Sequence, residues 1–216
     1  MSNKLVKRAI ASGPVKYEVR GPADQPTGLM LSINYEDAPV PDHYYVADWF
    51  DVRERDLDVI LSFGNLDRGR KLRSKVEIVF PSFTFVNQLW RSSLLFHGNL
   101  RKFLDDLKLP GVTREDAELS SDKLQILVSN NVLMVWSGTE CLLDFFYISP
   151  KDLWSKPRRG ERLDLEPVVR VLVSPSLLDG FLDACDITAA HLSERFPEYI
   201  RKGDPENENL ESQYVG

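Results

Sequence analysis

The chain has three histidines, His43, His97 and His191, and these side chains are the best suited to acid–base catalysis near neutral pH. His43 lies in the proline-flanked segment PVPDHYY, and the other two lie in segments with a helical pattern. Nothing in the sequence places a nucleophile or a second catalytic group beside any of them. The Gly-x-Ser-x-Gly motif of serine hydrolases is absent. We therefore expect no catalytic residue and a protein that is not an enzyme.

Metal and phosphate chemistry also lack their usual motifs. The sequence has neither a Cys-x-x-Cys pair nor a His-Glu-x-x-His segment. His191 and Glu194 lie one helical turn apart, but a metal would need further ligands from elsewhere. Neither of the glycine-rich loops that hold phosphates occurs. The sequence therefore predicts no metal site and no cofactor.

Two groups of cations occupy corresponding places in the two halves of the chain. They are Arg68, Arg70, Lys71 and Arg73 in the first half, and Arg158, Arg159 and Arg162 in the second. Such groups can recognise phosphate or an acidic partner, although solvated loops have the same composition. The formal net charge of −6 argues against a general nucleic-acid coat. Nucleic-acid or phosphate binding through paired basic loops is thus the alternative function.

The aromatic residues favour a different hypothesis. Phe145 and Phe146 are adjacent in one strand pattern, so they point to opposite faces of a sheet. A sheet with apolar residues on both faces needs a second layer, a second subunit or a bound strand, unless all of them fill one core. The first hypothesis is therefore a non-enzymatic protein-binding or assembly subunit that uses an apolar sheet face or edge, self-association included. The predicted surface residues are Trp49, Phe50, Trp136 and Phe146.

The elements that carry these residues form a pattern that occurs twice. Residues 46–64 align with residues 132–150, and each segment reads as a hairpin with DVRE or SGTE at its turn. A third strand follows at residues 76–82 and 169–175, and a serine then leads into a segment with helical periodicity. The pattern predicts an α+β fold made of two tandem antiparallel strand-strand-strand-helix units packed with pseudo-twofold symmetry.

The same pattern sets the expected boundaries along the chain. We expect an N-terminal arm and first strand in residues 1–35, repeat unit A in 36–109, repeat unit B in 110–202 and a disordered acidic tail in 203–216. Residues 123–128 predict a lead-in strand that matches the strand pattern of residues 29–33.

The compartment follows from the cysteines and the apolar stretches. Cys141 and Cys185 lie in apolar segments, where a reduced thiol behaves as a small hydrophobe. The N-terminus has no apolar run of signal-peptide length, and no stretch reaches the roughly 20 residues that span a bilayer. We expect a cytoplasmic protein with no membrane partner.

The second half resembles a small bacterial domain family of unknown function. The residues that carry the resemblance are the Leu143-Asp144-Phe145 strand and the segment VRVLVSP at residues 169–175, which leads into a helix. The first half departs from the pattern, with Val59 in place of the phenylalanine and Glu77 in place of the arginine. The resemblance implies an asparagine-led first strand, these two strands and one helix, and it implies no chemistry.

Overall fold

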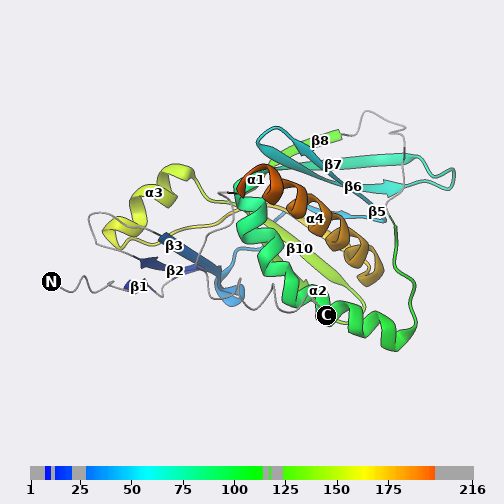
Figure 1. The fold of residues 1–216 in the computed structure, drawn as a ribbon, viewed down its shortest axis with the longest axis horizontal. Helices are drawn as coiled ribbons and strands as arrows, with labels where there is room; N and C mark the ends of the chain where they lie inside the picture. The colour runs from blue at the N-terminus through cyan, green and yellow to red at the C-terminus, as the bar shows by residue number, and fades with distance from the viewer. Residues whose placement is uncertain (1–7, 11–12, 21–27, 114–116, 118–123, 198–216) are drawn as a thin grey trace.

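The computed structural model describes residues 8–10, 13–20, 28–113, 117 and 124–197. These residues form three sheets and two long helices that lie side by side in front of the larger sheets (Figure 1). The sheets are mainly antiparallel, so the predicted α+β class is confirmed. No helix in these ranges is long and apolar enough to cross a membrane.

The first four-stranded sheet follows the predicted unit A. Its strands, in spatial order, are β5 (Trp49–Arg55), β6 (Asp58–Leu66), β7 (Leu72–Pro81) and β8 (Leu124–Val128). The first three are antiparallel neighbours, and β8 joins the edge parallel to β7. Val59, Leu61 and Phe63 alternate along β6 and are fully buried, because they point from the sheet toward the helices.

The second four-stranded sheet has the same arrangement. Its spatial order is β4 (Tyr44–Val46), β11 (Glu166–Val173), β10 (Cys141–Tyr147) and β9 (Asn131–Trp136). Strands β9, β10 and β11 are antiparallel neighbours, and β4 joins the edge parallel to β11. Each sheet therefore combines three strands of one predicted unit with one strand from the beginning of the other unit. Strand β8 of unit B joins the sheet of unit A, and β4 of unit A joins the sheet of unit B.

The chain crosses between these sheets at two similar points. The Ala47 amide donates to the Leu172 carbonyl at 2.9 Å and the Asp48 amide to the Gly64 carbonyl at 3.0 Å. At the second point the Ser129 amide donates to Val79 at 3.0 Å and the Asn130 amide to Phe146 at 3.1 Å. The units 36–109 and 110–202 thus exchange strands and are not separate domains. Their superposition as a true duplication stays a prediction.

Both predicted helices are present. After β7 the chain forms α1 (Ser82–Thr84), the π-helical η2 (Phe85–Trp90) and α2 (Arg91–Leu107), and after β11 it forms α4 (Pro175–Arg195). Ser174 caps α4, since its Oγ accepts from the Leu177 amide at 3.2 Å. Ser82 is the first residue of α1 and makes no cap bond of this kind, because Pro81 takes the cap position.

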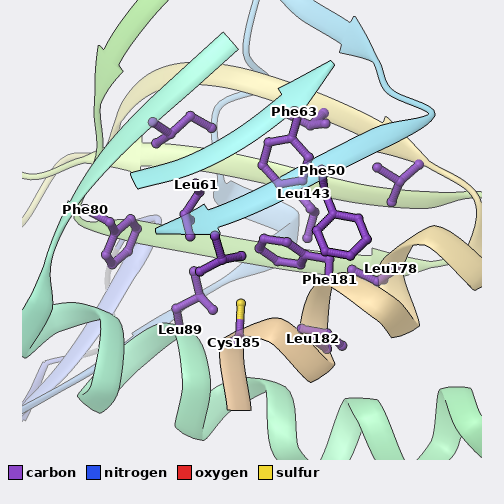
Figure 2. Packing of buried hydrophobic residues seen from close by; sticks show 14 of the residues in the cluster. Phe50, Leu61, Phe63, Phe80, Leu89, Leu143, Leu178, Phe181, Leu182 and Cys185 are labelled. Atoms are coloured by element: carbon purple, nitrogen blue, oxygen red, sulfur yellow. The ribbon is translucent and has the colours of Figure 1, made fainter. Parts of the chain in front are cut away.

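The main core lies between the two sheets and the two helices (Figure 2). The Phe63 ring is 6.1 Å from the Phe145 ring of the other sheet and 5.0 Å from the Phe181 ring of α4. Phe50 meets Phe181 edge to face at 6.1 Å. One continuous apolar cluster therefore ties both sheets to α4 and η2.

The N-terminal residues form a small third sheet with its own core. It contains β1 (Arg8–Ile10), β2 (Val15–Arg20) and β3 (Gly28–Ile33), followed by the short helix η1 (Tyr35–Asp37). Val15 and Tyr17 pack with Phe146 on the outer side of the second large sheet. Helix α3 (Pro150–Arg159) occupies the segment that was expected to be a loop, and the Tyr17 hydroxyl donates to the Glu161 carbonyl at 2.6 Å.

Two details of the predicted repeat are wrong. The segment DVRE lies inside β5, and the turn falls at residues 56–57, where Asp56 adopts a φ of 46°. Val59 pairs with Phe80 of the third strand, and the predicted alignment of the third strands matches Phe80 with Val173. Val173 pairs with Cys141, so Val59 corresponds to Cys141 and not to Phe145. The shift is an even number of residues, so each side chain keeps its predicted face. The segment SGTE does form the β9–β10 turn, as predicted.

Two further expectations concern the ends of the units. Strand β8, in the predicted lead-in segment 123–128, corresponds by its place in the sheet to β4 and not to β3. The predicted acidic tail at residues 203–216 lies outside the described residues.

Candidate functional site

A polar network joins the two long helices. Its members are Asp179, Asp183 and Asp186 on α4, and Trp90, His97 and Arg101 on η2 and α2. The three carboxylates follow one another at steps of three and four residues, so they share one face of α4. The network therefore replaces apolar packing with charge along part of this helix pair.

His97 is the centre of the network and is only 4% exposed. Its Nε2 lies 3.0 Å from Asp179 Oδ1 and its Nδ1 lies 3.3 Å from Asp186 Oδ2. Only the doubly protonated ring donates to both carboxylates at once. Burial and the charge of Arg101 lower the pKa of His97, but the hydrogen bond and charge of Asp186 and the hydrogen bond of Asp179 outweigh them, so the pKa is raised. The ring is therefore poorly suited to act as a general base.

The remaining donors add partners for all three carboxylates. Arg101 Nε lies 3.2 Å from Asp179 Oδ1, and its guanidinium also forms an ion pair with Asp183. Trp90 Nε1 donates to Asp186 Oδ1 at 2.8 Å. Each carboxylate thus has a partner on the opposite helix, which is the arrangement of a clamp between helices.

The same residues offer the spacing of a metal site. One ligand atom each from His97, Asp179 and Asp183 lies within 4.8 Å of the others. A metal would need a deprotonated imidazole, whereas the bonds to Asp179 and Asp186 favour the protonated ring. Arg101 already forms ion pairs with both Asp179 and Asp183. The geometry therefore favours a structural clamp with its own cations in place.

A cavity of about 330 Å³ lies on the other side of η2, between the edges of two sheets. It is lined by Leu31, Ser32, Ile33, Asn87, Gln88, Phe96, Asn131, Val132, Leu133 and Met134. Its walls are consecutive residues of β3, the last strand of the small sheet, and β9, the last strand of the second large sheet. The cavity is thus a groove between two strand edges, and we call it the β3–β9 groove.

The groove offers hydrogen-bonding groups without charge. The Ser137 amide donates to the Glu140 carbonyl at 3.0 Å. Because hydrogen-bonded and non-hydrogen-bonded pairs alternate along antiparallel strands, the amides of Val132 and Met134 point away from β10. Asn87 donates through Nδ2 to the Phe83 carbonyl at 2.9 Å. Its Oδ1 is buried with no hydrogen-bond partner among the described residues. None of the described residues that line the groove is ionisable.

The predicted aromatic surface does not exist as such. Trp49, Phe50 and Phe146 are buried, so the expectation that they line an exposed surface is wrong for these three. Phe146 is covered by the N-terminal sheet, which the prediction treated as an arm with one strand. Trp136 is half-buried, and its ring lies 4.7 Å from Phe103 of α2. These side chains serve the protein's own packing.

The predicted basic groups lie far apart. Arg68, Arg70, Lys71 and Arg73 belong to the β6–β7 connection and the start of β7, whereas Arg158, Arg159 and Arg162 belong to α3 and the segment after it. Figure 1 shows these two regions at opposite ends of the longest axis. In the second group, Arg162 pairs with Asp164 at 2.9 Å and Arg158 stacks on Trp154 at 4.0 Å. The two groups do not form one basic surface.

The other histidines stand apart from both features. His43 and His191 are exposed, and Glu194 is exposed on the same helix as His191. Of the three histidines, His97 alone has partners that a site would need, and they come from a helix far along the chain. The available sequence signal was the acidic stripe at positions 179, 183 and 186 on a helix that is otherwise largely apolar.

The two cysteines are free and buried. Burial raises the pKa of the Cys141 thiol to about 12 and raises that of Cys185 well above its usual value. Because the thiolate is the reactive form, we expect neither cysteine to react with Ellman's reagent in the folded protein. Both should react after unfolding in urea. Rapid release of the coloured product by the native protein would contradict this prediction.

Comparison of the chain with protein-family models, with curated proteins and with solved structures finds no match. The resemblance of the second half to a small bacterial family therefore stays a prediction.

Proposed function

We propose that the protein is a non-enzymatic binding protein that holds an extended segment of a partner protein in the β3–β9 groove. The observation that supports this function best is that both walls of the groove are edges of β-strands. An extended peptide that enters such a gap gains main-chain hydrogen bonds as an added strand. The buried Oδ1 of Asn87 adds an acceptor for one of its amides.

The lining indicates what the bound segment is like. The groove has apolar side chains from Leu31, Phe96 and Met134 together with amides and one hydroxyl, and no charge. A charged side chain would lose its hydration there without gaining a counter-ion. The proposed partner segment is therefore extended and carries uncharged, mainly apolar side chains toward the groove.

Nucleic-acid or phosphate binding through paired basic loops has weaker support. The two basic groups lie at opposite ends of the molecule, and cations of the second group have acidic or aromatic partners. Exposed charges at such a separation do not act on one ligand. We keep cytoplasm as the proposed location, since two reduced, buried cysteines suit a reducing compartment.

Selection from a random heptapeptide library displayed on phage, with the full-length chain as bait, tests the proposal. Enriched peptides should carry uncharged apolar residues at alternate positions, because one face of an added strand meets the groove. The Ser32→Trp variant fills the groove from an exposed lining position. It should weaken binding of an enriched synthetic peptide by at least about tenfold in fluorescence polarisation.

The matched control is Thr139→Trp, at an exposed position in the β9–β10 turn and outside the groove lining. This variant should bind the peptide as the parent does. Peptides that bind equally well to the Ser32→Trp variant, or a selection that enriches nothing, would contradict the proposed function.

A further inference from the structure

The edge strands of the two large sheets differ in how they resist pairing with another chain. Edge strands are usually short, charged, bulged or interrupted by proline, because exposed amides and carbonyls otherwise recruit a further strand. Strand β5 carries Asp51, Arg53 and Arg55, and β4 has three residues. Strand β9 forms a wall of the groove. The remaining edge, β8, has the sequence LQILV, with no charge and no proline, and its pairing with β7 shows no register shift.

Strand β8 also exposes its apolar side chains. Leu124, Ile126 and Val128 alternate along one face and are 43%, 60% and 53% exposed. The apolar strip is confined to this edge, because Val128 lies beside Val79 on β7, whereas Leu124 and Ile126 lie beside Lys75 and Glu77, which form an ion pair. An apolar strip at an open sheet edge is typical of an interaction surface.

We infer that β8 pairs with β8 of a second copy of this chain, antiparallel and about a twofold axis at Ile126. In this register Ile126 lies opposite Ile126 of the second copy, and Leu124 lies opposite Val128 of the second copy. Every cross-strand pair on the exposed face then joins two aliphatic side chains. The β5–β8 sheet of one copy and the β5–β8 sheet of the second copy then form one continuous sheet across the dimer.

A second copy fits this edge because the strand complements itself. A twofold interface requires one surface to match its own rotated image, and LQILV has apolar residues at the same spacing in both directions. Each chain carries a formal net charge of −6, which opposes association elsewhere on the surface. The uncharged edge brings no like charges together.

This interface is separate from the β3–β9 groove, so the two proposals fail independently. The dimer uses the open edge of β8, whereas the groove lies against β9 and β3. Loss of dimerisation should leave peptide binding unchanged, and the Ser32→Trp variant should remain a dimer.

Sedimentation velocity of the full chain over a wide range of concentrations tests the dimer. The parent protein should sediment with twice the mass of one chain. Ile126→Lys places two ammonium groups opposite each other, so it should weaken the dimer on the order of 100-fold. Leu57→Lys is the matched control, because Leu57 is an equally exposed apolar residue of the same sheet at the β5–β6 turn. A monomeric parent, or a dimer that withstands Ile126→Lys, would overturn the inference.

Cysteine cross-linking tests the register without adding charge, and it remains informative if Ile126→Lys unfolds. The two natural cysteines are buried, so an introduced surface thiol has no competitor among them. Ile126→Cys should form a disulfide-linked dimer on mild oxidation, because directly opposed residues of antiparallel strands have the Cα separation that a disulfide needs. Leu124→Cys alone should not cross-link, whereas its mixture with Val128→Cys should. Cross-linking of Leu124→Cys alone, or none in Ile126→Cys, would exclude this register.

Discussion

The Gly180→Ala variant is expected to unfold at a clearly lower urea concentration than the parent protein. Gly180 is buried in α4, and a Cβ at this position would lie 1.9 Å from the carbonyl oxygen of Val112. It would also lie 3.3 Å from the ring of Phe50. Because this oxygen belongs to the backbone, α4 and the segment that contains Val112 must move apart. The expected loss is about 3 kcal/mol, at the upper end of the usual cost of overpacking.

Gly98→Ala is the matched control for this substitution. Gly98 is exposed in the middle of α2, and a Cβ there meets nothing within 4 Å. Alanine is favoured over glycine in a helix by about 1 kcal/mol, so this variant should be slightly more stable. Urea unfolding followed by circular dichroism measures both changes. A Gly180→Ala protein as stable as the parent would show that α4 does not contact the Val112 backbone.

The second large effect is expected at His97. The His97→Gln substitution leaves Asp179 and Asp186 without their shared cationic partner at a site where the ring is 4% exposed. Removing one member of a buried charged network costs about 3 kcal/mol, since the remaining charge stays desolvated. Asp183 and Arg101 face the same position, and Arg101 limits the loss by neutralising Asp179.

The contribution of His97 should depend on pH in a definite direction. Its folded pKa is raised above the unfolded value, so the stabilisation is complete below the unfolded pKa of about 6.5 and is lost as pH rises through the folded pKa. The difference in unfolding free energy between the parent and His97→Gln should therefore be largest near pH 6 and smaller in alkaline buffer. The groups that face the ring are Asp179, Asp183 and Asp186 on α4 and Arg101 on α2.

The control for His97 is His191→Gln, at an exposed position on α4. An exposed surface substitution usually changes stability by less than about 0.5 kcal/mol. Urea unfolding at several pH values, with all three proteins in the same buffers, separates the two sites. A His97→Gln difference that grows toward alkaline pH would contradict the assignment of a protonated ring.

Local sequence determined most of the elements. Runs of aromatic and aliphatic residues beside polar turns predict β6, β10 and β11, because such side chains favour strands. Apolar steps of three and four residues predict α2 and α4, and the serine before α4 is its cap, as expected. The buried, reduced cysteines likewise follow from their apolar neighbours.

The local sequence pattern does not predict which distant strands pair with each other. A short strand such as β4 or β8 carries no mark of the sheet that it joins, because any open edge offers the same amides and carbonyls. Strands therefore pair across the predicted boundary between the two units. The same exchange leaves β8 at an edge with its apolar side chains exposed, a position that its sequence alone does not reveal.

The candidate sites depended on tertiary structure for the same reason. Sequence identified His97 as a histidine in a helix, but its meaning comes from Asp179 and Asp186, which only the packing of α2 on α4 brings within 3.3 Å. The β3–β9 groove exists because the edge strands of two different sheets line one cavity together with residues of η2. Local sequence determined the periodicity and composition of each element, because these depend on neighbours in the chain. The fold alone decided which polar groups meet and which strand edges stay open, because both depend on contacts between residues far apart in sequence.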